Sequence, residues 1–316
     1  MKMPRTEPFD RLLLIGKGFC MGAADIIPGV SGGTMAFILG VYERLIEAIR
    51  SFNWHWLRGL LRLDLKTIFG HPHFGFIIPL AMGIGLALLF FTRVVPLPYL
   101  LEHYPEPVYG LFFGLIAGSI IILLKLFRHD PLSWMILIVT TVFGWWLFNA
   151  VPAQTPATGW FVFLCGALAI SAMLVPGISG SFILLILNKY AYIVAAIGAF
   201  DFSVIIPFML GMLTGLVLFS RIMSWLLHHF YKQSIAAIIG LLIASLWVIW
   251  PFQVGVDGTV DGHAGMVNTM PVMPETISTS LGLTAGLIVI GFFSVLLLHR
   301  LADNRAVRNL NDHVYQ

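Results

Sequence analysis

The same Pro-Gly-x-Ser-Gly motif occurs twice in this chain and limits how the chain can fold. It lies in "IIPGVSGGTM", residues 26–35, and again 148 residues later in "LVPGISGSFI", residues 174–183. Both copies have apolar surroundings, because 59% of the 316 residues are hydrophobic and only 10% are charged. Such a composition predicts an integral membrane protein. The motifs predict that its membrane segments are broken at two matched places.

Six stretches are long enough to cross the membrane as helices, which takes about 20 predominantly apolar residues. They cover residues 74–93, 108–127, 132–151, 203–223, 235–251 and 279–299. The segments on either side of each motif are too short to span a hydrocarbon core of ~30 Å. We therefore expect two re-entrant helical hairpins, over residues 12–50 and 160–198.

The two motifs belong to a longer internal repeat. At an offset of 128, Pro79, Gly83 and Arg93 meet Pro207, Gly211 and Arg221. The predicted fold is an all-α integral membrane protein with one repeat over residues 1–152 and a second over 153–316, each holding one re-entrant hairpin and three transmembrane helices. Because three is odd, the second copy is expected to be upside down, which gives the inverted-topology repeat of many transporters.

Basic residues predict how the chain is oriented. The first repeat carries an insertion over residues 53–70 in which Arg58, Arg62 and Lys66 recur on one face, and we expect an interfacial amphipathic helix there. The loops 94–107, 151–160 and 252–278 contain no Lys or Arg. Because short cytoplasmic loops collect these residues, both termini are expected in the cytoplasm.

Each broken hairpin is predicted to bind an anion through backbone N–H groups at a helix N-terminus, with glycines allowing close approach and a serine adding a hydroxyl. The expected phosphate contacts are Pro28, Gly29, Ser31, Gly32, Gly33 and Thr34 in the first turn, and Pro176, Gly177, Ser179, Gly180 and Ser181 in the second. The alternative is that Pro and Gly only turn the chain. Two copies in register within an inverted repeat favour the binding role.

Four ionisable residues extend this hypothesis. Arg93 and Arg221 are matched by the repeat and can offer forked donors to a phosphate, although arginines near the ends of spans also snorkel to the interface. Asp25 and Glu43 lie in the first hairpin, where burial favours a neutral, protonated carboxyl. Asp25 is our first candidate for proton coupling and Glu43 the second, its alternative being a place at the inner membrane interface.

Several other kinds of site are not expected. Cys20 and Cys165 lie in apolar runs, which indicates neither a disulfide nor a metal site. The chain has no Walker motif, so ATP is not expected to drive it. We expect no metal, no cofactor and no nucleic-acid partner, and the sequence leaves open whether the chain forms a homo-oligomer.

The paired segments "GAADIIPGVSGGTMAFILGVYERLI" and "LVPGISGSFILLILNKY" resemble the polyprenyl-phosphate transporter family, and the resemblance covers nearly the whole chain. It implies a multi-pass protein of the bacterial plasma membrane, with membrane lipids around it, that is not an enzyme. The implied activity is flipping of undecaprenyl phosphate, the lipid carrier of envelope polymers, from the outer to the inner leaflet. The resemblance carries residue roles no further than the two turns.

Two alternatives use similar hairpins. Undecaprenyl-pyrophosphate phosphatases have a Pro-Gly-x-Ser motif, but it continues with an arginine and is accompanied by a glutamate-rich motif. Here the continuations are Gly32-Gly33 and Gly180-Ser181, and no span contains a glutamate cluster. A small-anion transporter or channel is the second alternative, which a groove open sideways to lipid distinguishes from a lipid carrier.

Proton coupling is expected from electrostatics. A phosphate monoester carries a charge of about −1.5 to −2 at neutral pH. Moving each negative charge against the inside-negative potential costs about 2.3 kcal/mol per 100 mV. Inward movement with one or two protons cancels most of that charge.

Overall fold

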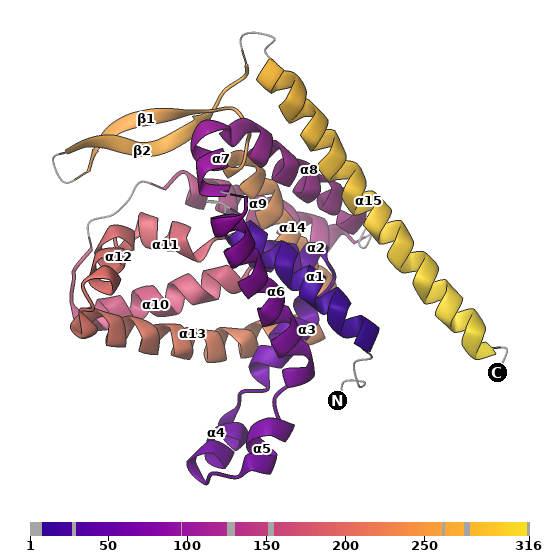
Figure 1. Ribbon diagram of the computed structural model, residues 1–316. Helices are drawn as coiled ribbons and strands as arrows, with labels where there is room; N and C mark the ends of the chain where they lie inside the picture. The colour runs from indigo at the N-terminus through magenta and orange to yellow at the C-terminus, as the bar shows by residue number, and fades with distance from the viewer. Residues whose placement is uncertain are drawn as a thin grey trace.

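The computed structural model describes residues 8–26, 30–95, 97–124, 130–150, 155–260, 263–274 and 279–314. The helices of the first half are α1 (Pro8–Asp25), α2 (Gly32–Ile38), α3 (Tyr42–Arg50), α4 (Trp54–Leu61), α5 (Leu65–Gly70), α6 (Phe74–Arg93), α7 (Leu97–His103), α8 (Pro105–Leu123) and α9 (Pro131–Phe148). The second half contains α10 (Gly159–Leu174), α11 (Gly180–Ile186), α12 (Tyr190–Gly198), α13 (Phe202–His229), α14 (Tyr231–Val248), β1 (Gln253–Val260), β2 (His263–Pro271) and α15 (Thr279–Val314) (Figure 1).

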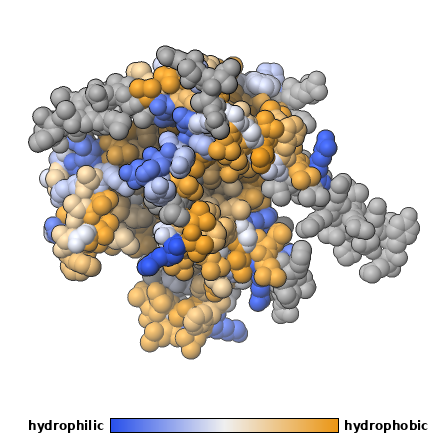
Figure 2. Space-filling model, turned by 45° about the horizontal axis from the view of Figure 1, so that its top comes forward, coloured by the Kyte–Doolittle hydropathy of each residue, from blue (hydrophilic) through white to orange (hydrophobic). Residues whose placement is uncertain are grey.

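The exterior of the helical bundle is apolar. In the part of the chain that the structure describes, six helices are long and apolar enough to cross a membrane, or seven if α11 and α12 are counted as one bent span. Large side chains such as Leu89, Ile138 and Leu213 are more than half exposed, at 63%, 58% and 56%. Figure 2 shows hydrophobic surface, in orange, over much of the visible face. Because water would penalise such a surface, the protein is a multi-pass membrane protein.

Both predicted hairpins have a return limb that is itself broken. After α1 the chain returns as α2 and α3, and after α10 it returns as α11 and α12, with a bend of 110° between α11 and α12. Gly40 ends α2 with φ +66°, and Asn188 ends α11 with φ +49°. Glycine and asparagine are the residues that adopt this left-handed conformation most readily after a helix. The two breaks lie at matching positions of the repeat.

At each break, a polar side chain donates a hydrogen bond to a main-chain carbonyl. In the first hairpin the Nζ of Lys17 donates to the Leu39 carbonyl at 2.8 Å. In the second, the Oγ1 of Thr155 donates to the matching Leu187 carbonyl at 2.5 Å, and the Nζ of Lys189 donates to the Thr155 carbonyl at 2.8 Å. The two halves therefore stabilise equivalent carbonyls with donors from different positions in the sequence.

Glycines let the first helix of each hairpin pack closely against the long helix that follows the hairpin. An added Cβ at Gly83 of α6 would collide with the Ile15 carbonyl of α1. An added Cβ at Gly211 of α13 would collide in the same way with the Phe163 carbonyl of α10. Small residues let membrane helices approach closely, so α1 packs along α6 as α10 packs along α13.

The remaining spans pair across the halves. α8 packs along α15, and α14 packs along α9. Glycine again permits the approach, because a Cβ at Gly114 would meet the Ile288 carbonyl, and one at Gly240 the Leu137 carbonyl. Each of these two pairs therefore contains one helix from each half of the chain, and the two halves form one bundle.

Two local expectations differ from the structure. The predicted single helix over residues 53–70 is two short helices, α4 and α5, because Leu63 adopts φ +54° and Asp64 caps a new helix by accepting from Lys66 and Thr67 N–H groups at 3.1 and 3.4 Å. The all-α expectation missed the antiparallel pair β1–β2 within the loop 252–278. This hairpin lies at the opposite end of the molecule from α4 and α5 (Figure 1).

Candidate functional site

A cavity of about 250 Å³ lies where the two hairpins meet. Its polar lining comes from both halves: Asp25 and Ser31 of the first hairpin, and Ser179 and Ser181 of the second. Gly180 and apolar side chains complete the walls, namely Ala169, Ile170, Met173, Leu184, Phe208 and Met212. The fold thus brings together two copies of a motif that lie 148 residues apart in the chain.

The first turn places a carboxylate at the edge of this cavity. α2 begins at Gly32, whose N–H donates to the Oδ1 of Asp25 at 2.7 Å. Ser31 is buried and caps the same helix, because its Oγ accepts from the Gly33 N–H at 3.1 Å. The N–H groups of Gly32 and Gly33, which were predicted to bind an anion, therefore donate to side chains of the first hairpin itself. Asp25 is the one titratable side chain in the described cavity lining.

The second turn has no such cap. α11 begins at Gly180, and the side chain of Ser179 accepts no capping hydrogen bond from the N–H groups of its first turn. Instead, the Oγ atoms of Ser179 and Ser181 lie 2.8 Å apart, and either can be the donor. Ser181 is exposed and Ser179 half-buried. Because a hydroxyl rotates to suit its partner, these two serines can turn toward a ligand in the cavity.

Two buried hydrogen bonds tie the turns to each other. The Gly177 N–H donates to the Oγ1 of Thr34 at 2.8 Å, and the Tyr42 hydroxyl donates to the Leu174 carbonyl at 2.8 Å. Thr34 is 1% exposed and Tyr42 2% exposed, so water does not compete for either bond. Thr34, expected as a phosphate contact, thus supports the second turn instead of lining the cavity.

Glycine is required where the turns touch. An added Cβ at Gly33 would lie 2.6 Å from the Met173 carbonyl oxygen, which is too close for any side chain. Gly177 adopts φ +97°, and a Cβ there would lie 3.0 Å from the Leu241 carbonyl carbon of α14. The second turn is therefore wedged between α2 and α14, beside Pro176, which is fully buried.

The predicted charged residues other than Asp25 lie outside the cavity. Arg93 ends α6 and Arg221 lies on α13; both are exposed, and neither lines the cavity. Glu43 lies in the first turn of α3, where its carboxylate lies near Tyr231 of α14. Pro28 and Gly29 of the first turn lie outside the described residues.

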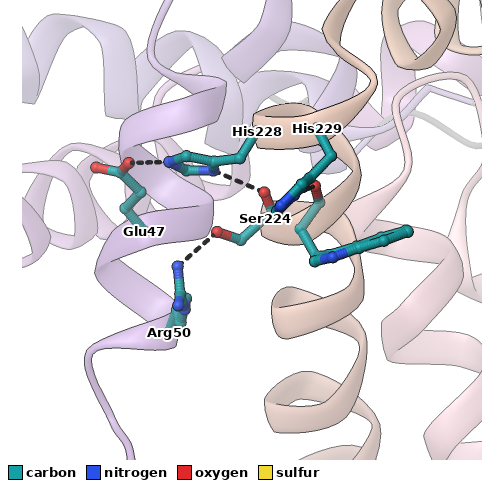
Figure 3. Close-up of polar contacts among 6 residues, drawn as sticks. Glu47, Arg50, Ser224, His228 and His229 are labelled. Atoms are coloured by element: carbon teal, nitrogen blue, oxygen red, sulfur yellow. Dashed lines mark hydrogen bonds and ion pairs between the residues drawn. The ribbon is translucent and has the colours of Figure 1, made fainter.

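Glu43 belongs to a polar seam, by which we mean the contacts of Glu43, Glu47 and Arg50 with α13 and α14. Glu47 Oε1 lies 3.8 Å from His228 Nε2, and Arg50 Nη1 donates to Ser224 Oγ at 3.0 Å (Figure 3). The spacing of the three residues puts them on one face of α3. The seam therefore joins the first hairpin to the second half of the chain, away from the cavity.

Sequence reasoning missed the apolar walls of the cavity and the role of Tyr42. Tyr42 has an identical match at Tyr190 in the repeat, which was an available signal. Phe208 directly follows the repeated Pro207, and Met173 stands at the position that matches Asp25. The repeat thus marked these positions without indicating which faces of their helices meet.

Comparison with known proteins identifies relatives of this chain. Residues 21–267 match the family model described as undecaprenyl phosphate translocase-like. A polyprenyl-phosphate transporter of Vibrio cholerae is 35% identical over 269 residues, covering 83% of this chain and 87% of that protein. A polyprenyl-phosphate transporter of Staphylococcus aureus is 32% identical over 257 residues, covering 74% and 84%. No solved structure matches the chain. The chain therefore belongs to the undecaprenyl phosphate translocase-like family of bacterial membrane transporters and is not an enzyme.

Proposed function

We propose that this protein moves undecaprenyl phosphate from the outer to the inner leaflet of the bacterial plasma membrane, and that the phosphate passes through the cavity between the two turns. The observation that carries the proposal is the meeting of both motif copies around one cavity, where three serines and Asp25 face a space with otherwise apolar walls. The relatives in Vibrio and Staphylococcus are polyprenyl-phosphate transporters, which supports the lipid class.

Within the cavity, Ser179, Ser181 and Ser31 are the hydroxyls within reach of a phosphate, and the Gly180 main chain lies beside them. Phosphate oxygens are strong acceptors, so hydroxyl and N–H donors suit them. Arg93 and Arg221 lie outside the cavity. We assign them contacts with the phosphate on its way in or out, where an exposed guanidinium can pair with it.

The transport route requires two opposed openings, and we propose that the halves are an inverted-topology repeat with both termini in the cytoplasm. Three packing features support this: the matched breaks at Gly40 and Asn188, the matched crossings at Gly83 and Gly211, and the exchanged pairs α8–α15 and α14–α9. Cysteines introduced at Ala157 and Thr259 are expected to react with an impermeant thiol reagent from outside, and those at Thr67 and Asn309 only from inside. The opposite pattern at any one of them contradicts the inversion.

The position of Asp25 supports the proposal of proton coupling. A phosphate in the cavity and the Asp25 carboxylate are like charges at close range, so binding of one anion disfavours ionisation of the other. The cavity lining contains no described cationic side chain that would relieve the repulsion. A lipid phosphate that binds there is therefore expected to bring a proton onto Asp25, which lowers the charge carried across the membrane potential. Glu43, held in the polar seam, is the second candidate.

A reconstitution experiment tests the proposal. Purified protein in proteoliposomes is expected to move undecaprenyl phosphate between leaflets, measured by accessibility of the phosphate to an added phosphatase. The double variant Ser179→Ala with Ser181→Ala removes the two open hydroxyls and is expected to slow this movement at least ~tenfold, because each lost bond to a charged group is worth about 1.5–3 kcal/mol.

Ser294→Ala is the matched control, because the Ser294 hydroxyl bonds only the Ile290 carbonyl of its own helix at 2.7 Å. Equal rates for the control and the double variant would place the phosphate elsewhere. Faster movement of inorganic phosphate than of the lipid would instead favour a small-anion transporter.

A further inference from the structure

A second and larger cavity lies between α8, α9, α14 and the segment that follows β2. It is an open groove of about 640 Å³, within the ~300–1,000 Å³ usual for small-molecule sites. We call it the tryptophan groove, after Trp145, Trp247 and Trp250 in its walls. No charged side chain is present in its described lining, and the hydroxyl of Thr141 is already bonded to the Leu137 carbonyl at 2.8 Å.

Aromatic contacts hold the walls of the tryptophan groove. Trp145 and Trp247 meet edge to face with ring centroids 6.3 Å apart, and Phe113 and Trp250 do so at 5.3 Å. The Nε1 of Trp250 donates to the Val272 carbonyl at 2.9 Å, which fixes the segment after β2 as the rim. The groove therefore presents a pre-formed, apolar surface of flat rings.

The groove lies at the outer end of the bundle in the proposed topology. Trp145 and Trp247 stand in the last turn of α9 and of α14, next to loops that contain no Lys or Arg. The basic helices α4 and α5 lie at the other end of the molecule (Figure 1). A lipid of the outer leaflet thus meets this groove before it reaches the inner side.

The groove and the second turn lie next to each other along one helix. Gly177 packs against the main chain of α14 at Leu241. Ala244, about one helical turn further along, lines the groove and packs with Ile178 of the same turn. The second turn and the groove therefore contact α14 about one helical turn apart, a separation that one long-chain lipid can span.

We propose that the tryptophan groove binds the first isoprene units of the polyprenyl chain while the phosphate lies at the turns. This rests on the proposed function, because it assigns a place to the tail of the same substrate. An isoprenoid carries a methyl branch and a double bond in every unit, so it offers CH groups and π-electrons to rigid indole faces. A straight acyl chain of a phospholipid makes fewer such contacts.

Photolabelling tests the assignment. Full-length protein in nanodiscs is irradiated with a diazirine-bearing polyprenyl phosphate or, separately, with a diazirine-bearing phosphatidylglycerol. The polyprenyl probe is expected to label peptides around Trp145 and Trp247, and excess unlabelled undecaprenyl phosphate is expected to compete. Labelling of these peptides by the phospholipid alone, or polyprenyl labelling without competition, overturns the proposal.

Adjacent tryptophans provide a matched pair of variants. Trp145→Ala removes a wall of the groove, whereas Trp146→Ala removes an exposed ring of the same helix that does not line it. Trp145→Ala is expected to weaken competition by undecaprenyl phosphate by about 3- to 10-fold, the effect of losing one aromatic contact, and Trp146→Ala to leave it unchanged. Equal behaviour of both variants, with transport intact in the wild type, refutes the groove and leaves the transporter proposal standing.

Discussion

Replacing Thr34 by valine tests whether the two turns depend on each other. The substitution keeps the shape of the side chain and removes the oxygen that accepts from the Gly177 N–H at 2.8 Å. Thr34 is 1% exposed, so no water replaces the lost acceptor. An orphaned buried donor costs about 1–3 kcal/mol, while hydrogen bonds between membrane helices average about 0.6 and reach about 1.7 kcal/mol.

We expect Thr34→Val to lower the free energy of unfolding by about 1–2 kcal/mol, toward the upper end of the membrane values because the orphan is a main-chain group in a turn. That is a change of about 5- to 30-fold in the ratio of folded to unfolded protein. The assay is reversible unfolding of the purified protein in mixed micelles with an increasing fraction of denaturing detergent.

Thr214→Val is the matched control for this measurement. The Thr214 hydroxyl bonds only the Leu210 carbonyl within α13, at 2.8 Å, so its loss orphans no donor of another segment. We expect a change below ~0.5 kcal/mol, as for most substitutions away from buried polar networks. If Thr34→Val is no less stable than Thr214→Val, the contact between the turns does not hold them together and the reasoning fails.

Three further changes test other parts of the site. Asp25→Asn is expected to abolish the response of lipid transport in proteoliposomes to a pH gradient, in which acid outside speeds inward movement, while binding persists; a variant that still follows the gradient places the coupling elsewhere. Gly177→Ala is expected to destabilise the protein by more than ~2 kcal/mol, because alanine is strained at φ +97° and its Cβ would lie 3.0 Å from the Leu241 carbonyl carbon. Unchanged stability in the same micelle assay would disprove that. Arg93→Ala and Arg221→Ala are expected to slow transport at least ~tenfold without abolishing binding, and unchanged rates would make both arginines interfacial anchors.

Hydropathy predicted the long spans well because length and apolarity alone define them. The expected span 74–93 coincides with α6, Phe74–Arg93. The span expected to end at residue 223 continues to His229, since Ser224 and His228 of α13 contact α3 through the polar seam. A contact with a distant segment leaves no mark in local hydropathy, so this extension was not predictable.

Short irregular elements were predicted less well. The break at Leu63 depends on one left-handed residue before Asp64, which an amphipathic pattern does not reveal. The β1–β2 hairpin did have a signal, because valines alternate with small residues around an Asp-Gly pair in that loop.

The candidate site was only partly predictable. The repeat indicated that both turns mattered, and the cavity lining does include Ser31, Ser179, Gly180 and Ser181. It did not indicate that Thr34 faces the other turn, because that pairing depends on how the two hairpins dock. Local patterns specify a turn, whereas the partner of its side chains is a property of the assembled bundle.

The bonds between the turns also set an order of events while the ribosome makes the chain. Thr34 and Gly177 are separated by 143 residues, which at ~5–20 residues per second takes about 7 to 30 s to synthesise. During that interval the first hairpin is already in the bilayer. The Thr34 hydroxyl, which accepts from the Gly177 N–H, and the Tyr42 hydroxyl, which donates to the Leu174 carbonyl, do not yet have these partners. A nascent chain halted before residue 174 is therefore expected to be a ready substrate for membrane proteases, and one that has passed α11 to be protected.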